Sequence, residues 1–180
     1  MGGSINTLAL SRFVLLLPVL LVVFLGCSRI FPPLGQFYQG EVLGISAYDV
    51  KRAQEIRFVQ GGTHYALVSI GEKQELIAFQ LVVVNARANS IKLEISKAPI
   101  ELVGLNQLGT YTQINPFDVS HKVSAPDDPS RFLYVDHLLW GTFELSKGEE
   151  LEGWAVFKIP KGILFEEMRW WAGDFVILKK

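Results

Sequence analysis

The segment Glu75–Asn85 (ELIAFQLVVVN) most constrains what this chain can fold into. A run of this length would also suit a helix, but Leu81 is followed by three consecutive valines, and β-branched residues favour strands. Both faces of such a strand would be largely hydrophobic, so we expect it in the middle of a sheet rather than at an edge.

Short apolar segments separated by turn residues follow one another along residues 41–180. Leu145–Pro160 shows the pattern well, since it joins a charged turn to one long strand that a proline ends. The only segment that suggests a helical turn is 162–168, and Gly44 is a candidate β-bulge. The sequence therefore predicts an all-β, immunoglobulin-like antiparallel β-sandwich behind an N-terminal apolar segment. The expected strands are 41–48, 55–59, 64–70, 75–85, 91–95, 100–105, 111–114, 132–145, 153–160 and 168–178.

The apolar N-terminus predicts export from the cytoplasm. Arg12 precedes the run Phe13–Leu25, and Leu25-Gly26-Cys27 follows the pattern of a bacterial lipobox, with Phe24 where that motif usually has Leu. We expect lipidation of Cys27, because a diacylglycerol supplies the two chains that stable anchoring needs. The alternatives are an uncleaved anchor helix and a cleaved signal with release. Each of them places residues 28–180 outside the cytoplasm.

The expected domain organisation follows from these boundaries. Residues 1–27 form the lipoprotein signal peptide or membrane anchor, 28–40 a tether, and 41–180 the β-sandwich domain. Pro32-Pro33 stiffens the tether, and Gly35 and Gly40 loosen it. An alternative is that the aromatic residues from Phe37 onward already belong to the core.

Composition excludes several classes of function. The formal net charge of −1 gives no broad positive field, so we expect no nucleic-acid partner. The single cysteine excludes an intramolecular disulfide and a thiolate metal cluster.

Two short signatures connect the chain with a known family. The first is the aliphatic strand that ends in Asn85, and the second comprises Leu145, Lys147-Gly148-Glu149, Gly153, Val156-Phe157 and Pro160. With these the chain resembles the telokin-like, immunoglobulin-like domains of bacterial secreted proteins and lipoproteins, a family of unknown function. It departs from the family pattern in a longer, proline-rich segment at 112–137. The resemblance implies an exported, anchored β-sandwich and supplies no catalytic residues.

The proline-rich segment 115–131 is expected to form one long loop, where binding functions concentrate. His121 and His137 flank it, and Asp127, Asp128 and Asp136 are near in sequence. Asp136 and His137 are adjacent, however, so in a strand they would point to opposite faces. No nucleophile pattern accompanies these residues either. We therefore expect no metal, no cofactor and no enzymatic activity.

The tryptophans provide the candidate partner contacts. If Phe157 faces the core, alternation places Trp154 on the outer face of its strand. Trp170 and Trp171 are adjacent, so one of them should point outward. Exposed aromatic side chains can stack on a sugar or anchor a protein partner, although loops or the tether could instead cover them.

We therefore expect a membrane-anchored extracytoplasmic lipoprotein on the outer side of the cell membrane. Its expected role is that of a protein-interaction or structural module of the cell envelope, with an envelope protein as partner. The alternative is an accessory domain that binds a carbohydrate or a small solute at the loop region 112–140.

Overall fold

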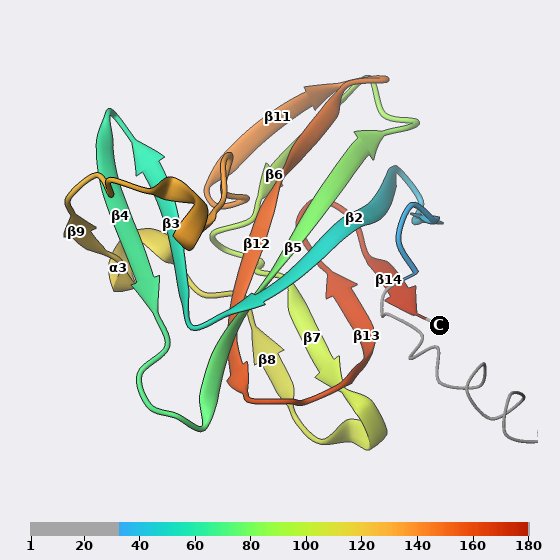
Figure 1. Cartoon of the computed structure of the whole chain (residues 1–180). Helices are drawn as coiled ribbons and strands as arrows, with labels where there is room; N and C mark the ends of the chain where they lie inside the picture. The colour runs from blue at the N-terminus through green and yellow to red at the C-terminus, as the bar shows by residue number, and fades with distance from the viewer. Residues whose placement is uncertain (1–32, 180) are drawn as a thin grey trace, which may run out of the picture. The chain divides into compact units, whose positions relative to one another are not determined.

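The computed structural model describes residues 33–179, which form several β-sheets and three short helical turns (Figure 1). In chain order the elements are β1 (Phe37–Gln39), β2 (Leu43–Ala53), β3 (Glu55–Gln60), β4 (Thr63–Val68), β5 (Gln74–Asn85), β6 (Ser90–Glu94), β7 (Glu101–Gly104), the 3-10 helix η2 (Leu105–Gln107), β8 (Thr110–Thr112), α3 (Pro116–Val119), β9 (His121–Val123), the 3-10 helix η3 (Pro129–Arg131), β10 (Leu133–Tyr134), β11 (Thr142–Ser146), β12 (Glu150–Pro160), β13 (Phe165–Trp170) and β14 (Val176–Lys179).

The central sheet has the strand order β1-β2-β5-β12, and all its pairs are antiparallel. Strand β5 pairs along its length with β2 on one side and β12 on the other (Figure 1). The prediction that the valine-rich segment lies in the middle of a sheet is confirmed. The smaller sheets are β10-β3-β4-β9, β11-β6 and β14-β13-β7-β8.

Hydrophobic side chains are buried on both faces of the central sheet. On one face, Phe79 of β5 and Phe157 of β12 meet edge to face at 6.0 Å in a core shared with β6, β7, β11, β13 and β14. On the other face, Trp154 and Val156 of β12 pack with residues of β3 and β4 in a second core. The expected all-β antiparallel sandwich is therefore confirmed, with β3 and β4 as a further layer on the outer face (Figure 1).

Asn85 joins the two signatures on which the family resemblance rests. Its side-chain amide donates to the carbonyls of Ala88 and Leu145, both at 2.9 Å, and its side-chain oxygen accepts from the Ala88 amide at 3.0 Å. The Asn85 backbone carbonyl accepts from Gly148 at 2.7 Å. The asparagine is fully buried with its polar groups paired, so it connects the end of β5 to both β11 and the turn before β12.

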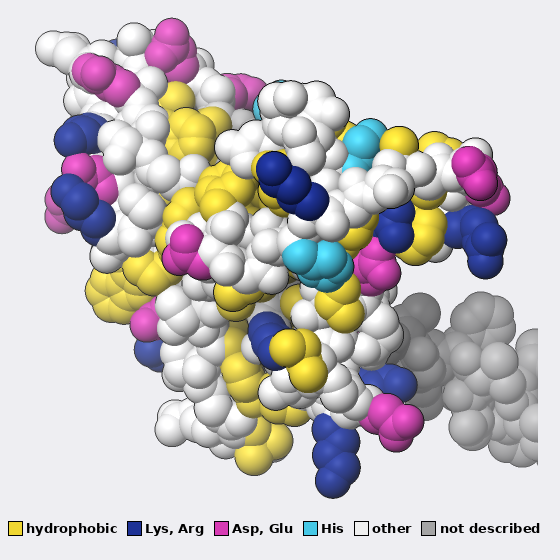
Figure 2. All heavy atoms as spheres, turned by 90° about the vertical axis from the view of Figure 1, so that its left-hand side faces the viewer, with side chains coloured by type: hydrophobic (Ala, Val, Ile, Leu, Met, Phe, Trp, Pro, Cys, Tyr) yellow, Lys and Arg dark blue, Asp and Glu magenta, His cyan; other side chains and the backbone are white. Residues whose placement is uncertain are grey.

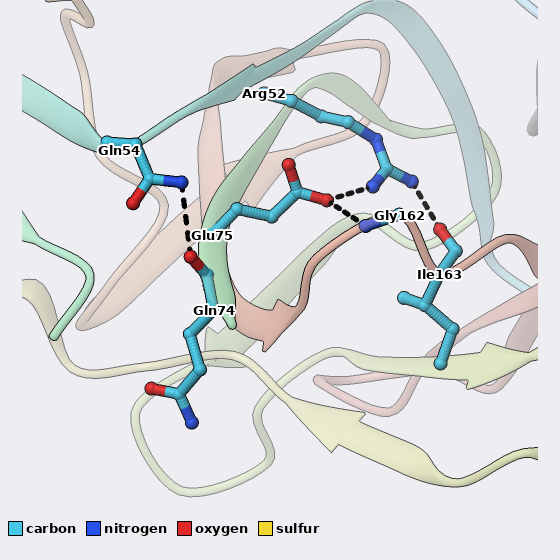
Figure 3. Close-up of polar contacts among 6 residues, drawn as sticks. All are labelled: Arg52, Gln54, Gln74, Glu75, Gly162 and Ile163. Carbon is cyan, nitrogen blue, oxygen red and sulfur yellow. Dashed lines mark hydrogen bonds and ion pairs between the residues drawn. The ribbon is translucent and has the colours of Figure 1, made fainter. Parts of the chain in front are cut away.

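A second polar cluster holds the turn between β12 and β13 (Figure 3). The Glu75 carboxylate accepts from the Arg52 guanidinium and, at 2.8 Å, from the Gly162 amide. Arg52 also donates to the Ile163 carbonyl at 2.5 Å. Glu75 is buried, and its partners are the Arg52 guanidinium and a backbone amide of the turn, so we assign this cluster a structural role.

Several expected boundaries and local features are wrong. Strand β1 occupies residues 37–39, so the sheet begins inside the expected tether, in agreement with the alternative that the residues from Phe37 onward already belong to the domain. The bulge in β2 lies between Ala47 and Asp49, whereas Gly44 pairs regularly. No helical turn forms at 162–168, which instead enters β13.

Two expected strands are interrupted. Residues 132–145 hold only the short β10 and the start of β11, and β10 runs parallel to β3. Residues 168–178 divide into β13 and β14, because Gly173 adopts a φ of 78° in the turn between them.

The predicted signal or anchor segment, including Cys27, lies outside the described residues. Between residues 33 and 179, none of the helices has the length and hydrophobicity needed to cross a bilayer.

Candidate functional site

A cavity of about 590 Å³ lies between β3, α3 and the segment 134–138. We call it the hollow. It is lined by Phe58, Val59, Gln60, Phe117, Tyr134, Val135, Asp136, His137 and Leu138. Figure 2, which views the side of β4, β9 and α3, shows exposed hydrophobic side chains next to histidine side chains on this face.

The aromatic walls of the hollow come from two elements that pack together. Phe58 of β3 stacks on Tyr65 at 5.3 Å and meets Phe117 of α3 edge to face at 6.0 Å. The helix α3 starts at Pro116, and the Asn115 side chain caps it by accepting from the Phe117 amide at 3.1 Å. The Phe117 side chain remains 41% exposed, so it is available to a ligand.

Strand β10 brings Tyr134 to the hollow. The guanidinium of Arg57 on β3 lies 3.4 Å from the centre of the Phe132 ring and donates to Glu55 at 2.5 Å. This bond to Glu55 raises the pKa of Arg57, which keeps its charge. His64 contacts the Tyr134 hydroxyl at 3.3 Å, so Tyr134 is held from the β4 side as well.

The segment 136–139 is fixed against β12 by its backbone. The carbonyl of His137 accepts from the Trp154 amide, and the carbonyl of Trp154 accepts from the Leu139 amide, both at 2.9 Å. The close approach requires glycine at 153, because a Cβ there would lie 2.1 Å from the His137 carbonyl oxygen. His137 itself has a φ of 46°, which is strained for a residue with a side chain.

Asp136 and His137 separate the hollow from a smaller recess of about 350 Å³. The recess is lined by Gln80, Asp136, His137, Glu152, Gly153 and Trp154. The Trp154 indole donates to Asp136 at 3.3 Å, and the Gln80 amide donates to Glu152 at 2.6 Å. The positive φ of His137 breaks the strand geometry, and Asp136 and His137 line both cavities instead of facing opposite ways.

The lining of the hollow is mixed in chemistry. The lining combines the aromatic side chains of Phe58, Phe117 and Tyr134 with the hydrogen-bonding groups of Gln60, Asp136 and His137, the usual composition of a small-molecule site. The lining of the hollow contains no serine, threonine or cysteine to act as a nucleophile. Throughout 33–179, no group of three His, Cys, Asp or Glu side chains is placed to hold a metal ion.

One of the adjacent Trp170 and Trp171 points outward, as expected, whereas Trp154 does not. Trp154 is 5% exposed and Trp170 is fully buried, whereas Trp171 is 44% exposed. The alternation along β12 is as predicted, with Phe157 in the main core. The inference that Trp154 faces solvent is wrong, because β3, β4 and residues near Val135 cover that face. Trp171 stays a candidate partner contact, and it stacks on Phe175 at 4.3 Å.

The expected long loop is more ordered than its prolines suggested. It contains α3, β9 and η3, and β9 pairs with β4. His121 lies in β9 opposite Ala66, and Asp128 caps η3 by accepting from the Ser130 amide at 3.0 Å. Of the charged residues noted from the sequence, only Asp136 and His137 line the hollow.

Sequence reasoning missed most of the site. Phe58 lies in an ordinary alternating strand, and Gln80 and Glu152 lie on strands whose outer face is only partly covered. Asn115-Pro116 before Phe117 could have been recognised as a helix start, since Asn is a common cap and Pro suits the first turn.

No protein-family model matches the sequence, and no curated protein matches it. Three solved structures resemble the fold. The yjhA protein of Bacillus subtilis is 14% identical over 76% of this chain and 79% of its own, with a TM-score of 0.48, and a candidate lipoprotein of Bacillus subtilis, ycdA, is 14% identical over 79% of this chain and 38% of its own, with a TM-score of 0.49. An uncharacterized β-sandwich protein of Clostridium difficile is 11% identical over 81% of this chain and 90% of its own, with a TM-score of 0.45. At these identities and TM-scores the likenesses carry no inference about function.

Proposed function

We propose that this protein is a membrane-anchored extracytoplasmic binding module, and that the hollow is its ligand site. The observation that carries the proposal is the hollow itself. Its volume of about 590 Å³ lies within the range of small-molecule sites, and its lining combines aromatic side chains with a few polar groups. Polyhydroxylated ligands such as sugars suit such a lining, since their apolar ring face stacks on aromatic side chains.

Binding rather than catalysis is supported by the polar groups of the hollow. The side chains of Asp136 and His137 are both more than 80% exposed, and 3.7 Å separates Asp136 Oδ2 from His137 Nδ1. Exposed groups of this kind hydrogen-bond a ligand readily, but they lack the enclosed, water-excluding setting that catalytic acids and bases need.

A fluorescence titration tests the site. Trp154 donates to Asp136, so a ligand that contacts Asp136 changes the environment of the Trp154 indole. We expect a panel of soluble sugars, added to the full chain in detergent, to contain at least one that changes tryptophan emission saturably. Phe117→Ala should abolish this response, while Phe175→Ala, outside the hollow, should leave it intact. A flat response to the whole panel would contradict the proposal for sugars.

The anchor forms the second part of the proposal, and it rests on the sequence at Leu25-Gly26-Cys27. Metabolic labelling with a fatty acid should mark the wild-type chain and leave Cys27→Ala unlabelled. A Cys27→Ala chain that stays in the membrane fraction without label would favour the uncleaved anchor helix. Equal labelling of both chains would contradict the anchor assignment.

A second candidate function, contact with an envelope protein, is favoured by the Trp171–Phe175 pair. The two rings are 44% and 45% exposed, and the Trp171 indole donates to Glu101 at 3.3 Å. Exposed aromatic pairs of this kind commonly anchor protein interfaces. Crosslinking in intact cells should yield a heterologous adduct that is lost in Trp171→Ala and kept in Phe117→Ala. Recovery of the monomer alone would count against this function.

A further inference from the structure

The charges around the hollow have one sign. Among the described residues that line the hollow and the recess, the carboxylates are Asp136 and Glu152, and neither lysine nor arginine is present. His137, between the two cavities, is the only other titratable side chain there besides the Tyr134 phenol.

Two basic side chains in the neighbourhood, Lys51 and Arg57, have carboxylate partners elsewhere. Lys51 lies 5.6 Å above the Trp154 ring, but its ammonium contacts the Asp49 carboxylate at 3.2 Å. Arg57, beneath β10, donates to Glu55 and stacks on Phe132. Neither basic group lines the cavities, so neither offsets the two lining carboxylates.

The carboxylates are held in place without being neutralised. Asp136 accepts from the Trp154 indole, and Glu152 accepts from the Gln80 amide, both of which are uncharged donors. Neither donor brings a positive charge, and each carboxylate has further lone pairs with which to accept from a ligand. Asp136 and His137 line both cavities, so a ligand in the hollow reaches the Asp136 carboxylate, whereas Glu152 lines only the recess.

The aromatic walls favour the same kind of ligand. The faces of the Phe117 and Tyr134 rings carry the negative side of the ring quadrupole and attract a cation placed over them, whereas Phe58 is buried and stacks on Tyr65. An anionic ligand in the hollow would meet the Asp136 carboxylate and these two rings, whereas a neutral one would gain nothing from the charges. The geometry points to an amine-bearing cationic ligand with an apolar face, of the amino-sugar class, and this assignment rests on the proposed function of the hollow.

Isothermal titration of the full chain in detergent at pH 7 tests the assignment with three matched probes. Glucosamine, glucose and glucuronate share one ring and differ in charge. We expect glucosamine to bind about fivefold more tightly than glucose, a ratio that corresponds to the free energy of one exposed ion pair. Glucuronate should bind most weakly. Raising the salt concentration should reduce the preference for glucosamine, because the carboxylates are exposed.

Two variants identify the source of the preference. Asp136→Asn should shrink the glucosamine-to-glucose ratio toward one, and Glu152→Gln should change this ratio less, because Glu152 lines only the recess. Glu144→Gln is the control, since Glu144 lies on β11 with Ser90 as its partner and outside both cavities. It should leave the ratio unchanged.

The possible results distinguish failure of the amine-ligand assignment from failure of the hollow as a binding site. Equal binding of glucosamine and glucose, lost in Phe117→Ala, would overturn the amine class and keep the hollow as a binding site. Absence of binding by all three probes, with a response elsewhere in the sugar panel, would likewise overturn the amine class alone. Absence of any response in both experiments would overturn both proposals.

Discussion

Replacing Gly153 by alanine tests whether the wall of the hollow lies against β12 as described. A Cβ at this position would lie 2.1 Å from the His137 carbonyl oxygen and 3.0 Å from Leu139 Cγ. Unbonded carbon and oxygen atoms settle more than 3 Å apart, so the segment 136–139 must move by more than ~1 Å or the strand must bend.

The cost can be worked out from the contacts that such a shift removes. The two backbone hydrogen bonds between Trp154 and residues 137 and 139 are each worth about 1 kcal/mol. Overpacking at a buried position adds about 2 kcal/mol. We therefore expect Gly153→Ala to lower the free energy of unfolding by about 4 kcal/mol, and the melting temperature by about 12 °C for a chain of this size.

The assay is chemical and thermal denaturation, with Gly44→Ala as a matched control. Gly44 lies in β2 of the same sheet, and a Cβ there meets only the Phe37 ring at an ordinary 3.6 Å. Gly44→Ala should be neutral or slightly stabilising, since alanine loses less backbone entropy in a strand. If Gly153→Ala is no less stable than Gly44→Ala, the close approach of residue 137 to β12 is wrong.

Three further predictions concern residues that the sequence alone did not explain. Asn85→Ala should destabilise the fold by roughly 3 kcal/mol in urea denaturation, because it leaves the buried Leu145 carbonyl and the Ala88 backbone groups unpaired; a loss under 1 kcal/mol would refute that role. His137→Gly should stabilise the fold by about 1 kcal/mol, since glycine adopts its positive φ without strain, and a loss of stability would contradict this. Burial would raise the pKa of Asp174, but its carboxylate accepts hydrogen bonds from backbone amides, including those of Leu43 and Val42. These bonds lower the pKa below its ordinary value. The ionised Asp174 carboxylate therefore stabilises the fold above about pH 4, and this stabilisation is lost as the pH falls through the lowered folded-state pKa. The difference in free energy of unfolding between the wild type and Asp174→Ala should then become smaller in acid, and a difference that grows would contradict the lowered pKa.

Much of the fold could be predicted because its strongest signals are local. The valines of β5 and the alternation along β12 each specify a strand and its core face, and both predictions are confirmed. The error at Trp154 has a different origin. Alternation tells which side chains share a face, but what covers that face depends on β3 and β4, which are more than 80 residues away in sequence.

The candidate site was less predictable for the same reason. The sequence indicated the region 112–140, and Tyr134, Asp136 and His137 do line the hollow. Its other wall comes from Phe58, which no loop-based reasoning would connect with that region. The pairing of β10 with β3 brings the two together, and two-residue strands such as β10 leave little periodicity to detect.

The most direct test of the account is an amide NMR titration of the isotope-labelled full chain in detergent with glucosamine. We predict saturable shift changes confined to the backbone amides of residues 58–60, Phe117 and 134–138, with weaker changes at Gln80 and Glu152. Changes concentrated at Trp171 and Phe175 would contradict the claim that the hollow is the binding site of this protein, and no changes at all, there or with any sugar of the panel, would contradict it as well.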